Sequence, residues 1–347
     1  MKTRALAPTV PDRLRRAGAP RLNLDELAMV AVAGEIVAPT QGASPWRIDR
    51  DGVPRVLPGP GGIVISHRVG DPCVGLAADH LEPGAAVQVR QKAMKGKPDA
   101  ANLALNTYAC IGNVALVLTG PCRGRRGVVT GKHGGVDHVL VDFPFQVLRP
   151  LRIGDRIQIY AYGPGLRLPD HPGLTLFNCS PRLAERWGLR ASPPRLMVPV
   201  THVIPAGIMG SGIGRDNACR GDYDIQLADL ALTRRLGLDR LRFGDLIAIV
   251  HADTRFGRAW HADFTTIGAV IHGDSVKSGH GPGVVTLITG ESRLLTPVRD
   301  PRANLAAVLK LRPLPKPTPR LPFTAAVRAA RAQRPVGLSC TNSGDCP

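Results

Sequence analysis

The sequence predicts a mainly β protein (β-rich α+β), made of several small barrel or stacked-sheet units with few short helices. Gly (39) and Pro (32) are both frequent among the 347 residues, and helix-period patterns are scarce. Short β-branched runs follow turns throughout the chain, as in proteins built from many short strands. With 44% hydrophobic residues, the chain is large enough for one or two well-packed domains.

We expect four segments. Residues 1–24 are predicted to be a basic flexible N-terminus, 25–150 an N-terminal β-rich unit, 151–295 a C-terminal β-rich domain, and 296–347 a basic Pro-rich, largely disordered tail. The two ends hold much of the formal charge of +18, since 1–24 carry six Lys or Arg against one acid and 296–347 carry nine against two. Such ends attract nucleic acid without specificity, or only keep a protein soluble.

The first unit opens with a short helix after Asn23, where Glu26 completes a capping box. Asp51-Gly52 predicts a hairpin turn. A phrase then occurs three times, at 81–89, 151–159 and 241–249: a Gly turn followed by a strand of aliphatic residues. Three copies favour barrel or stacked-sheet units over a parallel α/β sheet.

The Gly-rich segment 120–131, with the strand-like 138–143, resembles a KOW-type element. Such elements are SH3-like barrel hairpins of ribosomal and transcription proteins, so the resemblance implies paired strands and makes Arg123, Arg125, Arg126 and Lys132 candidate nucleic-acid contacts. A barrel hairpin with solvated arginines is the alternative. No aromatic residues alternate with these arginines, which counts against base stacking.

Short helices are expected at 180–189, where Ser180 caps and Pro181 starts the helix, and at 229–236, which closes at Gly237. One further helical stretch, 323–333, is expected in the tail.

Histidine and aspartate residues gather between 206 and 290. In a strand, residues i and i+2 face the same side, so each H-x-D pair would present an imidazole and a carboxylate to one space. The predicted metal ligands are Asp222, Asp224, His251, His261 and His272. The predicted catalytic residues are Asp253, Asp274 and His280.

Mixed imidazole and carboxylate donors suit Zn²⁺, Mn²⁺ or Fe²⁺, so a divalent metal is the expected cofactor. The alternative is that each His is a hydrogen-bonded loop residue and that Asp274 only satisfies turn amides.

The stretch that contains GDYDIQ, GDLIAIVHADTRFGR and HGDSVKSGHGPGV resembles an uncharacterised prokaryotic family that is known only as a domain of unknown function. The resemblance covers about 25–295 and implies a mainly β fold with several barrel-like units.

The order of GD, D and H residues is also similar to acetamidase/formamidase-type amide hydrolases. That similarity implies a metal site in which Asp222 or Asp224 and His251 take part, although the group's H-x-x-x-G-D-G-E signature is absent after His251.

Three functions follow from these patterns: a metal-dependent hydrolase of a small amide or related C–N bond, an RNA-associated β-barrel protein, or a structural assembly protein without catalysis. The hydrolase would take a small-molecule substrate, and a homo-oligomer is expected. No run of 18 apolar residues occurs, which predicts no membrane span. Seven scattered cysteines without a CxxC pair favour reduced thiols and a cytoplasmic location.

Overall fold

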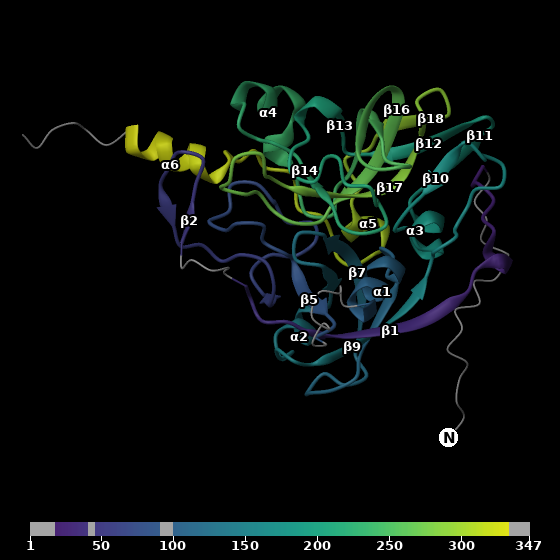
Figure 1. Ribbon diagram of the computed structural model, residues 1–347, viewed down its shortest axis with the longest axis horizontal. Helices are drawn as coiled ribbons and strands as arrows, with labels where there is room; N and C mark the ends of the chain where they lie inside the picture. Colours follow the sequence, from purple (N-terminus) through teal and green to yellow (C-terminus); the bar gives the residue numbers. More distant parts are fainter. Residues whose placement is uncertain (1–17, 41–45, 91–99, 333–347) are drawn as a thin grey trace, which may run out of the picture.

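The computed structural model describes residues 18–40, 46–90 and 100–332. Two large sheets dominate these residues, a barrel in the lower part of Figure 1 and a second sheet above it. This architecture confirms the predicted mainly β fold with barrel units and few short helices. In the described ranges, no helix has the length and apolar character needed to cross a membrane.

The barrel closes because β1 pairs with β9 on one side and with β5 on the other. All of its neighbouring strands are antiparallel. In order around the ring, they are β1 (Met29–Ile36), β9 (Arg156–Tyr162), β6 (Val114–Val117), β7 (Arg126–His133), β8 (His138–Asp142) and β5 (Gly84–Gln88), and β4 (Ile63–Val64) extends from β5.

Alternation of side chains explains the barrel core. In β9, Ile157, Ile159 and Ala161 are buried, while the residues between them are partly accessible. Inward-facing residues of a small closed barrel fill its interior in this way. The predicted hairpin at 120–143 forms β7 and β8, and the strands of the repeated phrase become β5, β9 and β15.

The second sheet has apolar residues on both faces, because one face packs toward the barrel and the other is covered by loops and helices. Along β15, Leu246 and Ala248 join one hydrophobic cluster and Ile247 and Ile249 join another. Its strands, in order, are β10 (Leu174–Leu176), β17 (Gly283–Glu291), β16 (Ala259–Val270), β15 (Leu246–Asp253) and β13 (His202–Pro205), and β14 (Tyr223–Asp224) also pairs with β17.

Smaller elements surround these sheets. Two minor sheets contain β2 (Arg47–Ile48) with β3 (Pro54–Arg55), and β11 (Arg190–Ser192) with β12 (Arg195–Val200) and β18 (Leu295–Arg299). The helices are η2 (Leu24–Glu26), α1 (Ala100–Tyr108), α2 (Phe145–Leu148), α3 (Pro181–Arg186), η3 (Ala206–Ile208), α4 (Leu230–Leu236), η4 (Leu238–Arg240), α5 (Leu305–Val308) and α6 (Phe323–Ala332).

Several predicted boundaries are confirmed. Ser180 caps α3 with Pro181 in its first turn, and α4 begins at Asp229 and ends at the left-handed Gly237. The turn at Asp51-Gly52 joins β2 to β3. The predicted capping box at Asn23 does not form. Only a 3-10 turn follows Asn23, and its side-chain amide donates to the carboxylate of Glu26 and to the carbonyl of Gly165.

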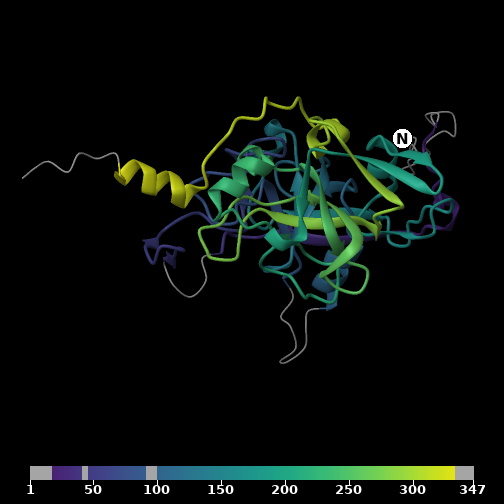
Figure 2. The same ribbon diagram turned by 90° about the horizontal axis from the view of Figure 1, so that it is seen from above.

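The predicted tail is ordered through Ala332, so the expectation of disorder from 296 onward does not hold for 296–332. Arg312 forms an ion pair with the buried Asp142, with Nη2 2.6 Å from Oδ1. Arg242 donates to the carbonyls of Pro301 and Pro315. These contacts hold the segment along the molecule before α6 projects outward (Figure 2). Residues 333–347, including the CTNSGDCP tail, and residues 1–17 lie outside the described ranges.

The first sheet ends later in the chain than the predicted boundary at 150. Strand β9 pairs with β1 and β6 of the barrel, although residues 151–295 were predicted as the C-terminal domain. The third copy of the phrase, at β15, belongs to the second sheet.

Candidate metal centre

A buried cluster of His and Asp side chains lies where the barrel meets the second sheet. The barrel side supplies His80, from the segment before β5, and His133, from the last position of β7. The second sheet supplies Asp222 and Asp224 around β14, and His272 just after β16. Two groups of three ligand atoms each lie within 4.8 Å of one another: His80, Asp224 and His272, and His133, Asp222 and His272. The cluster could therefore hold a metal ion.

Two atoms in the cluster face each other without a hydrogen bond. Nε2 of His272 and Oδ2 of Asp222 are 2.8 Å apart, within ion-pair distance, yet among the described residues neither atom has a partner of acceptable hydrogen-bond geometry. Both residues are buried, and His272 is 0% exposed. Donors that bind one ion at about 2.0–2.2 Å lie about 2.8–3.5 Å from each other. The spacing therefore fits two ligands of a common ion.

Three imidazoles are oriented through Nδ1, which leaves Nε2 turned into the cluster. Nδ1 of His80 lies 3.1 Å from Oδ1 of Asp79, and Nδ1 of His133 lies 2.6 Å from Oε1 of Glu82. Nδ1 of His272 lies 2.9 Å from the carbonyl oxygen of Gly273. A carboxylate or carbonyl behind the second ring nitrogen is the usual support of a histidine that binds metal.

These supporting groups are themselves held in place. Glu82 is buried and also contacts Nδ1 of His138 at 3.0 Å, while its Oε2 accepts from the amide of Gly61. Asp79 contacts Arg47 at 2.6 Å and accepts from the hydroxyl of Ser275. The rings of His80 and His133 are thus fixed from behind by groups that belong to the barrel half and its loops.

The fourth imidazole, His280, completes the open side of the cluster. Its Nδ1 lies 3.0 Å from Nε2 of His80 and 3.1 Å from Oδ2 of Asp224. The side chain of His280 is 30% exposed, whereas those of His80, Asp224 and His272 are at most 8% exposed. Solvent therefore reaches the cluster past His280.

The buried carboxylates dominate the electrostatics. Burial opposes charge on His272, but Asp222 and Asp224 outweigh it and raise the pKa of this histidine well above its usual value. Burial likewise opposes the charge on Asp224, yet the neighbouring imidazoles of His272, His280 and His80 hold its pKa well below the ordinary range. Two ionised carboxylates in a buried site need cationic compensation, which either a protonated His272 or a bound divalent ion would supply.

The comparisons with known proteins also find two parts in the chain. Residues 46–185 match the family described as "Domain of unknown function (DUF4438), N-terminal", and residues 186–309 match its C-terminal counterpart. The chain belongs to the DUF4438 family. It is also similar to the structure titled "Crystal structure of TM1086", with 41% identity, a TM-score of 0.78, and coverage of 83% of this chain and 99% of that one. A search of curated proteins found no match.

The membership confirms the family resemblance and places the cluster between the two DUF4438 domains. His80, Glu82 and His133 lie in the N-terminal match, and Asp222, Asp224 and His272 lie in the C-terminal match. Clefts between domains are common places for binding sites. Neither DUF4438 domain contains the whole set of donors.

Close backbone approach joins the two halves at this point. Gly134, at the tip of the β7–β8 hairpin, touches Gly221: a Cβ on Gly221 would lie 2.4 Å from the Cα of Gly134. The amide of Gly134 also donates to Oδ1 of Asp222 at 2.8 Å. The KOW-like hairpin thus positions both His133 and Asp222.

The structure brings together four of the predicted site residues and separates three others. Asp222, Asp224, His272 and His280 converge. Asp274 lies beside them: its carbonyl accepts from the amide of His80, and burial raises its carboxyl pKa to about 6. His251, Asp253 and His261 do not join the cluster.

A β-bulge explains the position of His251. The register of β15 and β16 shifts between Val250 and Ala252, and His251 has φ +63 and is exposed. The rule that residues i and i+2 share a face fails across a bulge. Asp253 instead pairs with Arg255 at 2.8 Å, and His261 is exposed and packs edge-on against Phe264. The structure therefore gives these three predicted residues no part in the buried centre.

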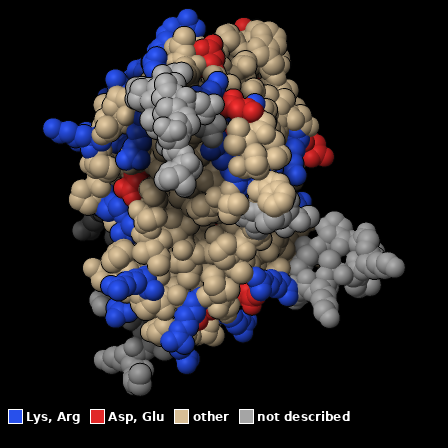
Figure 3. Space-filling view, turned by 90° about the vertical axis from the view of Figure 1, so that its left-hand side faces the viewer, with Lys and Arg blue, Asp and Glu red and all other residues tan. Residues whose placement is uncertain are grey.

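Of the four predicted nucleic-acid contacts, three are exposed and one is buried. Arg123, Arg125 and Arg126 are exposed at the start of β7, roughly 23 Å along the strand from His133. The structure corrects the prediction for Lys132. This residue is fully buried, and its Nζ donates to Oδ1 of Asn178 and to the carbonyl of Cys219, so it is not available to a phosphate. On the face in Figure 3, Lys and Arg are scattered around the edge rather than gathered in one track.

Sequence reasoning missed the barrel half of the centre: Asp79, His80, Glu82, His133 and His138. Two signals were present. Asp79-His80-Leu81-Glu82 has the same alternation as the H-x-D pairs, and His133 and His138 flank the turn of the KOW-like hairpin. What joins them to Asp222 is a contact between residues about 90 apart, which no local pattern reveals.

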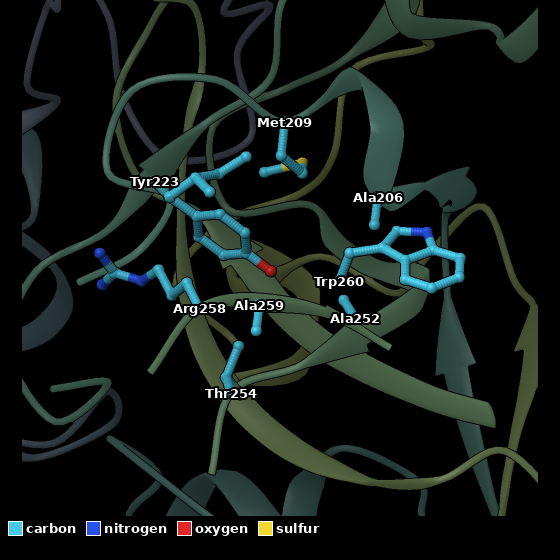
Figure 4. Close-up of a pocket in the computed structure, with 9 residues that line it drawn as sticks. Ala206, Met209, Tyr223, Ala252, Thr254, Arg258, Ala259 and Trp260 are labelled. Carbon is cyan, nitrogen blue, oxygen red and sulfur yellow. The ribbon is translucent and has the colours of Figure 1, made fainter. Parts of the chain in front are cut away.

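A separate small pocket lies behind β14. Its volume is about 70 Å³, and Figure 4 shows Tyr223, Arg258 and Trp260 around it. Tyr223 lies between Asp222 and Asp224 in the chain, but it belongs to the hydrophobic cluster that contains Ile247 and Ile249. The pocket is therefore separated from the histidines by the strand itself.

Proposed function

We propose that this protein is a metal-dependent hydrolase of a small amide or related C–N bond. The observation that carries the proposal is the convergence of buried His and Asp donors, in which Nε2 of His272 lies 2.8 Å from Oδ2 of Asp222. Mixed imidazole and carboxylate ligands favour Zn²⁺, Mn²⁺ or Fe²⁺.

A divalent ion in such a site polarises a carbonyl group and lowers the pKa of a coordinated water toward neutrality. The protein's own residues supply the rest of the site. Asp79 and Glu82 fix the orientation of the imidazoles, and the partly exposed His280 marks the side from which a substrate enters.

Of the residues predicted as catalytic, Asp274 is assigned to proton transfer. Asp253 is bound to Arg255 at a distance from the cluster, and His280 lies among the donors. The carboxyl of Asp274 is buried, its Oδ2 has no hydrogen-bond partner among the described residues, and its backbone carbonyl accepts from the amide of His80. The choice of a C–N bond rests on the aspartate part of the similarity to acetamidase/formamidase-type hydrolases, since Asp222 and Asp224 lie in the cluster whereas His251 does not.

The test measures bound metal and ammonia release on the same full-length protein. We expect divalent metal in the purified chain, and hydrolysis of at least one member of a panel of short amides, such as formamide and acetamide. His272→Ala is expected to bind less metal and to release no ammonia, whereas His251→Ala, which changes an exposed histidine of the same region, should change neither. A wild-type chain that takes up no divalent metal overturns the proposal. Bound metal without release of ammonia from any amide overturns the C–N substrate.

A further inference from the structure

We propose that the centre holds two divalent ions bridged by Asp224. The inference rests on the metal site of the proposed function and goes further, because it assigns the donors to two ions and makes His280 a ligand.

The first group of donors consists of His133, Asp222 and His272. Their ligand atoms lie within 4.8 Å of one another, and Nε2 of His272 is 2.8 Å from Oδ2 of Asp222. The other oxygen of Asp222 accepts from the amide of Gly134, which leaves Oδ2 for an ion. Three protein ligands with a remaining open position are the usual set of a reactive metal site.

The second group consists of His80, His280 and Asp224. Nε2 of His80 is 3.0 Å from Nδ1 of His280 and 3.6 Å from Oδ2 of Asp224, and Nδ1 of His280 is 3.1 Å from the same oxygen. All three sides of this triangle are close to the separation of neighbouring donors around one ion, about 2.8–3.5 Å.

Asp224 connects the groups because its two oxygens face different histidines. Oδ1 lies 3.6 Å from Nε2 of His272, in the first group, whereas Oδ2 faces His80 and His280. A carboxylate that bound one ion through a single oxygen would not need histidines beside both of its oxygens. Two ions about 3.5–4 Å apart, as in known two-metal hydrolytic sites, would each receive one of its oxygens.

The charges of the donor side chains fit two divalent ions when an anion is also bound. Asp222 and Asp224 supply two negative charges, since Glu82 and Asp79 are already paired with histidines and Arg47. Two divalent ions therefore leave an excess of positive charge at the open side near His280. Hydroxide or a carbonyl oxygen with developing negative charge would be stabilised there.

The experiment uses the full-length protein loaded with Mn²⁺ and freed of loosely bound metal by dialysis. We expect about two Mn²⁺ per chain by elemental analysis. We also expect an electron paramagnetic resonance spectrum of a spin-coupled pair, in place of the six-line signal of isolated Mn²⁺. One ion per chain with an isolated six-line signal overturns the two-ion centre but leaves the proposed function intact. No bound ion overturns both.

Three variants assign the donors. His280→Ala and His133→Ala should each bind one uncoupled ion, because each lacks one group's ligand, and Asp224→Ala should lose the coupling. His251→Ala is the matched control and should keep two coupled ions. His280 is partly exposed, so its replacement leaves the core packing intact, and the melting temperature of each variant checks its fold. Two coupled ions in either His280→Ala or Asp224→Ala would contradict the assignment.

Discussion

At the scale of single residues, the orientation of each imidazole is set by the group behind it. Glu82 is the clearest case, since one buried carboxylate contacts both His133 and His138 and accepts from the amide of Gly61. Burial opposes ionisation of Glu82, but the two histidines outweigh it, so its pKa is held well below the ordinary range. An ionised Glu82 keeps the Nδ1 proton of His133 in place and leaves Nε2 free to bind a metal.

Replacing Glu82 with Gln tests this orientation. The amide has nearly the same shape but carries no charge, and its NH₂ group cannot accept a hydrogen bond from Nδ1. We expect metal affinity to fall about 10- to 100-fold, the usual cost of losing an outer-shell partner. Titration of the metal-free protein with Zn²⁺ by calorimetry measures the change. An unchanged affinity would show that His133 does not depend on Glu82 for metal binding.

Gly283 offers a steric test of the same centre. A Cβ at this position would lie 2.0 Å from Oδ2 of Asp222 and 2.2 Å from Nε2 of His272. Gly283→Ala should therefore displace these two donors and remove the ion that they share. Metal content per chain is the measurement. Gly207→Ala is the control, because a Cβ there meets no atom within 4 Å. Full metal content in Gly283→Ala would mean that these two atoms are not ligands.

The sequence predicted half of the centre, and the missing half has a physical explanation. Asp222, Asp224, His272 and His280 were predicted because they are close in the chain and have strand-like spacing. His251 shares that spacing, but the bulge beside it turns it outward. His80 and His133 were missed because their roles depend on a contact between the two DUF4438 domains, which local spacing does not report.

At the scale of elements, prediction succeeded where local chemistry decides the structure. The cap at Ser180, the helix end at Gly237 and the turn at Asp51-Gly52 depend on hydrogen bonds within a few residues, and all three formed as expected. Strand pairing is a different problem. The closure of the barrel by β1 and β5 joins Glu35 to Gln88, which are distant in the sequence, and nothing in either strand alone specifies that partner.

The contact between the β7–β8 hairpin and the loop before β14 is the element that aligns the two halves. Gly221 has φ +74, and a Cβ on it would meet the backbone of Gly134. Gly221→Ala should therefore combine a left-handed backbone penalty of about 1–2 kcal/mol with an overpacking cost of about 1–3 kcal/mol. Unfolding in denaturant, monitored by circular dichroism, measures the total.

Gly124→Ala is the matched control for that measurement. Gly124 has φ +82, and a Cβ added to it would meet no atom within 4 Å, so only the backbone penalty applies. The difference between the two variants isolates the cost of pushing the hairpin away from Asp222. If the two lose the same stability, the Gly134–Gly221 approach is not a tight contact in solution.

At the scale of the whole molecule, the centre ties the barrel to the second sheet. Its donors come from both DUF4438 domains, and the unfolded chain holds them far apart, so a bound ion favours the folded state. With free metal at 100 times its dissociation constant, linkage adds about 2.7 kcal/mol to the free energy of unfolding. We therefore expect the melting temperature to fall by several degrees when a chelator removes the metal, and to recover when Zn²⁺ or Mn²⁺ is added back.

His272→Ala separates this linkage from any general effect of metal on the protein. His272 belongs to the first group of donors, so its loss should remove that group's ion and make the shift between chelator and added metal smaller. His251→Ala should still respond as the wild type does, because His251 lies outside the buried centre. A shift of equal size in His272→Ala would mean that the stabilising ion binds elsewhere.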